Sequence, residues 1–353
     1  MSYEDGWAAL NLEKPARIPH TEMSAEWYHC PLVAAVTGMD IDVDSPVEDR
    51  EKACAAFVAA WNYDVHMACY FPPNAYGDNW TNMGHAEYAQ YGRDFERPTE
   101  CPFKTVSQAL ALDPWEAFAS LDHGQLLRGF NESYDWEKRF YPGIVPGTGI
   151  YHTLMSGMIA VFGWEMLLTA AGENPEGFGH VVNRYAAWIQ RHYNALADSN
   201  AELVWVHDDM VWTEGAFLHP SWYRRYLFPN MKKLFAPLVE AGKKILFVCD
   251  GDYTQFAKDV ADCGVTGFWF ECFTDLKYMV ETFGQTHVLI GNGDCRPLTF
   301  GTKDDVRAEV QRCMSLGREC PGYFMCINGH MPPNIPVENA LHYYDVYTEL
   351  SRR

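Results

Sequence analysis

Five short apolar runs in the carboxy-terminal half of the chain each end in acidic, amide or imidazole side chains, and this repeated pattern limits the fold more than any other feature. The runs cover residues 203–206, 245–249, 267–270, 288–290 and 323–326. Each has the length of one buried strand, and helical segments lie between them, so the pattern predicts repeated βα units and a parallel sheet. Because chemistry in such sheets lies at the carboxyl ends of the strands, we expect these polar ends to form one wall of an active site.

The polar side chains at the five strand ends are the first candidates for function. They are His207, Asp208, Asp209, Asp250, Asp252, Glu271, Asn292, Asp294, Asn328 and His330. Strand alternation allows only one of Asp208 and Asp209 to point inward, and we expect Asp209 to do so while Asp208 caps or pairs on the surface. Glu271 follows Phe268-Trp269-Phe270, which predicts a carboxylate that faces an apolar site.

Structural roles stay open for several of these residues. Asp250-Gly251 could form only a turn, and Asn292 with Asp294 could belong to a glycine-rich turn between a strand and a helix. His330 could hydrogen-bond the neighbouring loop. Alternation along its strand turns Cys249 away from the cleft.

The length of 353 residues permits two domains, but α/β barrels of this size form one compact unit, so we expect a single domain over residues 1–353. Pro15, Pro19 and Pro31 predict an irregular segment over residues 1–45. Residues 72–103 are rich in Asn, Gly, Tyr and Trp, which indicates a lid loop. Helices are expected over residues 47–63 with Ser45 as the cap, and over 155–171, 174–197, 219–226, 231–241, 253–263, 275–283 and 301–316.

The charge and cysteine pattern exclude several classes of protein. The formal charge of −20, from 47 acidic and 27 basic residues, repels nucleic acid and anionic membrane surfaces. The amino terminus has no basic leader with an apolar region behind it, and no apolar run approaches the roughly 20 residues of a membrane span. The 11 cysteines include no CxxC pair, which argues against a disulfide framework or a zinc ribbon. We expect a cytoplasmic protein that binds neither nucleic acid nor membrane, and a homodimer stays open.

Six motifs in the second half of the chain follow one another in a recognisable order. They are Val206-His207-Asp208-Asp209, residues 244–252, Gly291-Asn292-Gly293-Asp294, Gly301-Thr302-Lys303, residues 322–330 and Pro336-Val337-Glu338-Asn339. This order resembles the uroporphyrinogen decarboxylase superfamily from about residue 140 to the end, and less so before it. The resemblance implies a (β/α)8 TIM barrel whose active site lies in the cleft at the carboxyl ends of the strands, with an irregular amino-terminal extension and lid loops.

The superfamily contains decarboxylases and cobalamin-linked methyltransferases, so the resemblance alone leaves the reaction open. Its decarboxylases carry amino-terminal arginines that hold a polycarboxylate tetrapyrrole. The comparable residues 17–22 have one arginine and a glutamate, Glu22, and the acidic strand ends would repel an anionic macrocycle. The sequence therefore argues against porphyrinogen decarboxylation and leaves decarboxylation of a smaller carboxylic acid as the alternative.

Superfamily methyltransferases that methylate coenzyme M hold zinc with a His-x-Cys pair and a later Cys. At the matching positions this chain has Val248, Asp250 and the pair Gly329-His330. The resemblance therefore implies harder ligands for a zinc ion, with Asp250, Glu271 and His330 as candidates. No cobalamin-anchoring Asp-x-His-x-x-Gly motif occurs in the chain. A corrinoid would come from a partner protein, and the acidic surface of this chain suits docking to a basic face.

The resemblance thus implies a methyltransferase that demethylates a small molecule, such as an aryl methyl ether, and passes the methyl group to the cob(I)alamin of a separate corrinoid protein. Bound zinc or a protonated side chain would stabilise the departing phenoxide, and an aromatic pocket would hold its ring. Candidate catalytic residues are Glu271, His330 and Asp209. Candidate substrate-binding residues are Asn292, Asp294, His207, Glu22, Trp80 and Tyr76, with Trp164 as a further pocket candidate.

Overall fold

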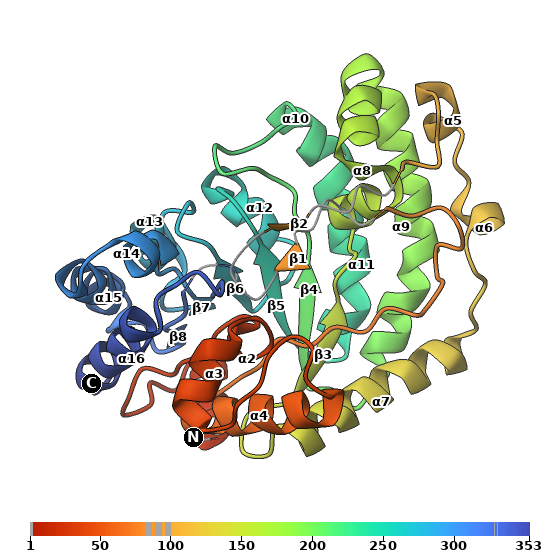
Figure 1. The fold of residues 1–353 in the computed structure, drawn as a ribbon. Coiled ribbons are helices and arrows are strands. Elements are labelled where there is room, and N and C mark those ends of the chain that lie inside the picture. The colour runs from red at the N-terminus through yellow and green to blue at the C-terminus, as the bar shows by residue number, and fades with distance from the viewer. Residues whose placement is uncertain (1–2, 82–86, 89–93, 96–99, 328, 330) are drawn as a thin grey trace.

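The computed structural model describes residues 3–81, 87–88, 94–95, 100–327, 329 and 331–353. At its centre is a parallel sheet in which six strands lie side by side in chain order (Figure 1). The strands are β3 (Gly147–Ile150), β4 (Leu203–His207), β5 (Lys244–Cys249), β6 (Gly267–Phe270), β7 (Val288–Ile290) and β8 (Tyr323–Phe324). The five apolar runs in the sequence correspond to β4 through β8, so the predicted α/β fold with a parallel sheet is confirmed.

Two extended segments, one at His20 and one at Val65, join the two edges of this sheet. His20 forms a parallel bridge with Met325 just beyond β8, and Val65 forms a parallel bridge with Val145 just before β3. The segments are also linked to each other, because the N–H of Asp64 donates to the carbonyl oxygen of His20 at 2.9 Å. Eight strand segments therefore surround one axis, as in a (β/α)8 barrel.

Side chains alternate along each strand and form two separate apolar layers. The layer inside the barrel includes Leu203 and Trp205 from β4, Val248 from β5 and Trp269 from β6. The rings of Trp205 and Trp269 lie 5.5 Å apart. Gly147 in β3 leaves space for this packing, because a Cβ atom there would lie 2.7 Å from Nε1 of Trp205. The filled interior holds the strand ends in fixed positions around the site.

Helices cover the outside of the barrel (Figure 1). They are α8 (Met155–Glu173), α9 (Pro175–Ala197), α10 (Pro220–Trp222), a π-helical turn (Tyr223–Leu227), α11 (Phe228–Glu240), a 3-10 turn (Thr254–Phe256), α12 (Ala257–Ala261), α13 (Leu276–Phe283), α14 (Cys295–Phe300), α15 (Lys303–Gly317) and α16 (Val337–Leu350). Local caps start two of them where the sequence predicts: Asn174 accepts the N–H of Gly177 at α9, and Thr302 forms a capping box with Asp305 at α15.

The amino-terminal part is more helical than expected. Residues 1–45, predicted to be irregular, contain α1 (Tyr3–Leu10), α2 (Ala25–Tyr28) and α3 (Cys30–Thr37). Pro31 stands in the first turn of α3, where a proline is tolerated because its missing N–H would have no helical partner. The prolines therefore prevent a long helix in this segment and still permit short ones.

The helix expected after residue 45 is α4 (Val47–Ala60), but Ser45 does not cap it. Pro46 occupies the N-cap position without a side-chain hydrogen bond. The hydroxyl of Ser45 instead donates to the carboxylate of Asp42. Helices α5 (Val106–Leu110), α6 (Pro114–Ala117) and α7 (His123–Phe140) then lead to β3.

The segment predicted to be a lid, residues 72–103, is described in part. Residues 72–81 and 100–103 contain no helix, and β1 (Glu87–Tyr88) pairs antiparallel with β2 (Asp94–Phe95). Residues 82–86, 89–93 and 96–99 lie outside the described part of the chain. The assignment of this segment as a lid stays a prediction.

Helix α8 is long and apolar, which the sequence analysis did not expect. The expectation that no apolar run approaches the length of a membrane span was wrong. By length and composition it could cross a membrane, with a mean hydropathy of 1.3 over the apolar window. In the fold, 61% of that window is buried inside the protein, and α8 packs against α5 and α9. Its apolar character is therefore explained by packing in the core.

Candidate active site

The carboxyl ends of the strand segments surround two neighbouring cavities. The larger has a volume of about 610 Å³ and the smaller about 180 Å³. Asp250, which directly follows β5, lines both of them, so the two cavities are neighbours at this residue. This is the end of a parallel barrel at which active sites are built.

The end of β4 presents His207 and Asp209 to the cavities and turns Asp208 away from them, because successive side chains on a strand point to opposite faces. Asp208 is fully buried, and its Oδ1 accepts hydrogen bonds from the N–H groups of Leu154 at 3.0 Å and Ser156 at 2.9 Å, at the start of α8. Burial raises the pKa of Asp208 to about 7. Asp208 therefore caps a helix, but from the interior and not from the surface where we expected it.

His207 is held in one orientation by its neighbours. Its Nδ1 lies 3.0 Å from the carbonyl oxygen of Tyr151, and since a carbonyl can only accept, Nδ1 carries the proton. The rings of His207 and Tyr151 stack with their centroids 3.9 Å apart. Burial lowers the pKa of His207, but the carboxylates of Asp209 and Asp250 outweigh burial and raise it to about 9. The Nε2 atom of His207 therefore faces carboxylates in a fixed geometry.

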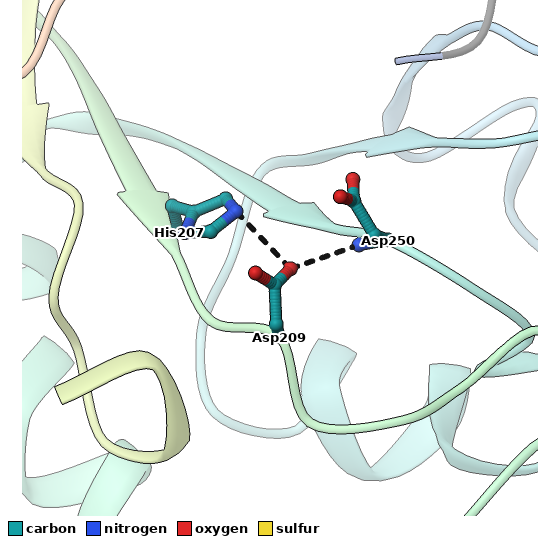
Figure 2. Close-up of side chains that lie close together, drawn as sticks. All are labelled: His207, Asp209 and Asp250. Atoms are coloured by element: carbon teal, nitrogen blue, oxygen red, sulfur yellow. Dashed lines mark hydrogen bonds and ion pairs between the residues drawn. The ribbon is translucent and has the colours of Figure 1, made fainter. Parts of the chain in front are cut away.

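His207, Asp209 and Asp250 form a cluster whose ligand atoms all lie within 4.8 Å of one another; Figure 2 shows the three side chains. The backbone N–H of Asp250 donates to Oδ1 of Asp209 at 3.3 Å. Asp250 is exposed toward the cavities, and the surrounding protein still reduces its hydration and raises its pKa well above the usual range. The neighbouring carboxylates of Asp209 and Glu271 raise it further. Either a proton or a cation relieves such crowding of negative charge.

The donor set of this cluster fits a divalent metal ion. One imidazole and two carboxylates are ligands that zinc and related ions accept. The Nδ1 of His207 is held by a backbone carbonyl, which is the usual arrangement for the second nitrogen of a metal-binding histidine. The sequence placed Asp250 in the metal site but assigned His207 to substrate binding and Asp209 to catalysis.

The larger cavity combines carboxylates with aromatic walls. The carboxylates are those of Asp209, Asp250 and Glu271, and the aromatic residues are Trp164, Trp212 and Phe273. Oε2 of Glu271 accepts the N–H of Gly251 at 2.9 Å, which ties the end of β6 to the end of β5. The rings of Trp164 and Trp212 lie 6.0 Å apart. Among the described residues that line this cavity, none is a lysine, an arginine or a histidine.

Glu22 borders the smaller cavity from the end of the first strand segment. Its side chain is buried, and Oε1 lies 2.9 Å from Nε2 of His20 and also accepts from the hydroxyl of Tyr343. Oε2 accepts the N–H of Ile327 at 2.9 Å. These contacts join the first strand segment to the end of β8 and to α16, so Glu22 holds the barrel together as well as bordering the cavity.

His66, at the end of the second strand segment, lies between two buried carboxylates. Its Nε2 is 3.1 Å from Oε1 of Glu26 in α2, and its Nδ1 is 3.1 Å from Oε2 of Glu137 in α7. Burial lowers the pKa of His66, but the two carboxylates outweigh burial and raise it to about 10. His66 also lines the smaller cavity. This triad could not be predicted from the sequence, because no local motif links three residues from three separate segments.

Two residues predicted to bind substrate instead support the backbone near the site. Asn292 is buried, and its Nδ2 donates to the carbonyl oxygens of Thr274 at 2.8 Å and Glu271 at 3.3 Å. Asp294 occupies the N-cap of α14, where it accepts the N–H of Arg296 and pairs with its guanidinium. Neither residue is part of the lining of the two cavities.

The predicted aromatic residues divide between two places. Tyr76 and Trp80 line a separate cavity of about 220 Å³. Tyr76 is buried there with its hydroxyl 2.7 Å from that of Tyr185, and Trp80 is 52% exposed. Trp164 lines the larger cavity. His330 lies outside the described residues, so its roles as metal ligand and catalytic residue stay predictions.

An ion pair on α15 supports this region from behind, and the sequence analysis missed it. Nη2 of Arg312 donates to Oε1 of Glu309 at 2.6 Å and to the carbonyl oxygen of Asn292 at 2.9 Å. Oε1 of Glu309 also accepts the N–H of Asp294 at 2.7 Å. The only signal in the sequence is an acidic and a basic residue three positions apart on a helix, which is common on solvated faces.

Comparison with known proteins identifies the family of this barrel. The sequence profile described as "Uroporphyrinogen decarboxylase (URO-D)" matches residues 148–350, more than half of the chain. The uroporphyrinogen decarboxylase of Geobacter sulfurreducens is 23% identical over 179 residues, which cover 51% of this chain and 51% of that protein. A uroporphyrinogen decarboxylase of Thermus thermophilus is 29% identical over 163 residues, which cover 46% of each chain. The chain spans about half the length of the curated relatives it matches.

Among solved structures, one described as "methyltransferase from Methanosarcina mazei" aligns over 99% of both chains, with a TM-score of 0.62 and 15% sequence identity. At this identity the likeness shows a shared fold. The structural alignment includes the amino-terminal part of the chain, which the family profile leaves unmatched. On the profile match over β3 to α16, the chain belongs to the uroporphyrinogen decarboxylase family of enzymes.

Proposed function

We propose that this protein is a methyltransferase that takes a methyl group from a methylated small molecule and passes it to the cob(I)alamin of a separate corrinoid protein. The observation that carries the proposal is the lining of the larger cavity, where Asp209, Asp250 and Glu271 stand with aromatic walls and without a basic residue in the described part. A tetrapyrrole with many carboxylates would be repelled there. A shared barrel with a methyltransferase over nearly the whole chain adds support.

The residues of the site would position the donor and stabilise its leaving group. For an aryl methyl ether, Trp164 and Trp212 would hold the ring and exclude water. The bond between methyl carbon and oxygen breaks with its electron pair left on oxygen, and the methyl group forms a bond with the electron pair of cobalt(I). The carboxyl of Asp250, whose pKa is raised, would give its proton to the departing oxygen.

As the alternative to this proton, the cluster of His207, Asp209 and Asp250 would hold a zinc ion through deprotonated carboxylates. Such an ion supplies a Lewis acid that stabilises negative charge on a leaving oxygen. Its ligands come from the ends of β4 and β5, so the ion would border the same cavity as the aromatic walls.

The test is methyl transfer in vitro. The full chain is mixed with chemically reduced cob(I)alamin and with aryl methyl ethers, methylated amines or thioethers in turn, and methylcobalamin is followed by its absorbance. We expect turnover with at least one class, and Asp250→Asn should reduce kcat/KM by at least about 100-fold because it removes a group at the reacting centre. Glu281→Gln, on the exposed face of α13, is the matched control and should leave the rate unchanged.

The competing activity is decarboxylation of a small carboxylic acid. Release of carbon dioxide from such an acid without a corrinoid, together with no methylcobalamin from any donor, would overturn the proposal.

A further inference from the structure

We infer that the methyl donor is a methylated ammonium cation, bound between the aromatic walls and the carboxylates of the larger cavity. This inference rests on the proposed function and narrows its substrate from methylated compounds in general to a cationic class. Three features carry it: the charge of the cavity lining, the arrangement of its aromatic rings and the chemistry of the leaving group.

The larger cavity carries acidic groups and no basic ones in the described part of its lining. Asp209 pairs with His207 at 3.1 Å, and Asp250 carries a proton or a metal ion in the proposed reaction, so the carboxylate of Glu271 provides the negative charge of this lining. Charges of one sign inside a cleft with low-dielectric walls concentrate ions of the opposite sign, and the net charge of −20 acts in the same direction. An anionic donor would be repelled by the carboxylate of Glu271, and a neutral aryl ether would gain no charge interaction from it. A cationic donor would gain one.

Three aromatic side chains, Trp164, Trp212 and Phe273, line this cavity. Trp164 and Trp212 have ring centroids 6.0 Å apart, and Phe217, which is not part of the lining, packs against both and holds them in place. Trp212 is 46% exposed although it is large and apolar. Phe273, a further wall residue, already has the guanidinium of Arg296 5.8 Å from its ring centroid. Tryptophan faces attract quaternary ammonium groups through their quadrupoles, and several such faces around one cavity are the usual recognition device for these cations.

The leaving group also favours an ammonium donor. When a quaternary ammonium gives up a methyl group, the bond between carbon and nitrogen breaks, its electron pair stays on nitrogen, and a neutral tertiary amine departs. The methyl group bonds to cobalt(I) with the electron pair of the metal. No negative charge develops on the leaving group, so no lysine, arginine or oxyanion-type donor is required. The described residues that line the larger cavity include no lysine and no arginine, which agrees with a neutral leaving group.

A metal ion in the neighbouring cluster is compatible with this cation. A divalent ion held by His207, Asp209 and Asp250 would balance the two aspartates and leave the charge of Glu271 at the cavity wall. The cation would then bind at the side of Glu271, Trp164 and Trp212. The inference therefore holds with and without the metal.

The test is a binding measurement that does not depend on turnover. Choline and its uncharged carbon isostere 3,3-dimethylbutan-1-ol are titrated into the full chain by isothermal titration calorimetry, without any corrinoid, in chelated protein and again with zinc. We expect choline to bind at least about tenfold more tightly than the isostere, since the two differ only in charge and cation–π contacts of about 1–2 kcal/mol amount to this factor.

Two variants and a matched control locate the binding. Glu271→Gln and Trp212→Leu should each weaken choline binding by about fivefold to tenfold and change binding of the isostere by less than twofold. Glu281→Gln on α13 removes an equal charge from an exposed helix and should change neither. Circular dichroism confirms that each variant is folded.

The results separate this inference from the proposed function. Equal binding of choline and the isostere, or choline binding that survives both variants, would overturn the inference, and methyl transfer from an aryl ether would then leave the proposed function standing. The opposite result is selective choline binding without methylcobalamin from any quaternary ammonium compound. It would show that the site binds cations but does not serve methyl transfer, and it would overturn the proposed function.

Discussion

The Nε2 atom of His207 lies 3.1 Å from Oδ1 of Asp209, two residues further along the chain at the end of β4. The two side chains share a face because strand side chains alternate with a period of two. Asp208 between them is directed into the core, where it anchors the start of α8. The end of one strand therefore carries both the pair of His207 and Asp209 and the buried carboxylate of Asp208 that supports it.

The cluster at the ends of β4 and β5 should bind zinc. After removal of metals with a chelator, calorimetric titration should give about one zinc ion per chain. His207→Gln or Asp250→Asn should each lower the zinc affinity by more than about 100-fold. Loss of a hydrogen bond that only supports a ligand costs roughly 10–100-fold, and these variants remove the ligand itself. Asp252→Asn is the matched control, because Asp252 is near in sequence but its carboxylate accepts from Thr254. Undiminished zinc binding in both ligand variants would rule out this site.

Ser156 should act as a positioning residue for the same cluster. Its hydroxyl oxygen accepts the N–H of Asp209 at 2.8 Å and lies 3.3 Å from Nδ1 of His207. Ser156→Ala should lower zinc affinity by about 10–100-fold while the free energy of unfolding falls by only about 1 kcal/mol. Ser315→Ala, at an exposed hydroxyl on α15, should change neither quantity. A loss of stability with unchanged zinc affinity would show that the role of Ser156 is purely structural.

The triad of Glu26, His66 and Glu137 should make stability depend on alkaline pH. The pKa of His66 is raised from 6.5 to about 10 in the folded protein, so its stabilising contribution is complete below pH 6.5 and is lost as pH rises toward 10. Urea unfolding should show the wild-type protein losing on the order of 3 kcal/mol more than His66→Gln over this interval. Titrating groups away from the triad are common to both proteins and cancel in the difference.

An exposed histidine gives the control for that comparison. His180→Gln on α9 should follow the wild-type pH profile, because no carboxylate pair surrounds His180 in the described contacts. Parallel profiles for wild type and His66→Gln would contradict an imidazolium at position 66.

The closure of the barrel should depend on Asp64. This fully buried carboxylate accepts two bonds from Arg17 and the N–H of His20 at 2.8 Å, so it links the two strand segments that complete the ring. Asp64→Asn should lower the free energy of unfolding by about 3 kcal/mol, because it removes the buried carboxylate partner of Arg17 and leaves only the pair with Asp5. Glu319→Gln breaks the exposed pair with Lys14 and should leave the urea midpoint unchanged. Equal midpoints for Asp64→Asn and wild type would refute this role.

Much of the fold could be predicted from the sequence because the signals are local. The apolar runs at residues 267–270 and 288–290 coincide with β6 and β7. The cap at Asn174 and the capping box at Thr302 start α9 and α15 at the expected positions. A buried strand is a short run of apolar residues, and a helix cap involves residues within one turn of the helix start. Both features can therefore be predicted from a few neighbouring residues.

The relationships that could not be predicted are not local. Asn292 was predicted to bind substrate, and its amide N–H groups donate to the carbonyl oxygens of Thr274 and Glu271. Glu26 and Glu137 are 111 positions apart in the sequence and meet on the same histidine. A polar side chain at a strand end can serve a ligand or a neighbouring backbone, and only the positions of distant groups decide between them.

The sequence by itself determined the order of the βα units and the supply of acidic side chains at the strand ends, because helix and strand periodicity are properties of neighbouring residues. The tertiary structure decided that His207, Asp209 and Asp250 share one cluster and that the segments at His20 and Val65 close the ring. Those relationships depend on strand register and on the curvature of the sheet, which bring together residues that no local pattern connects.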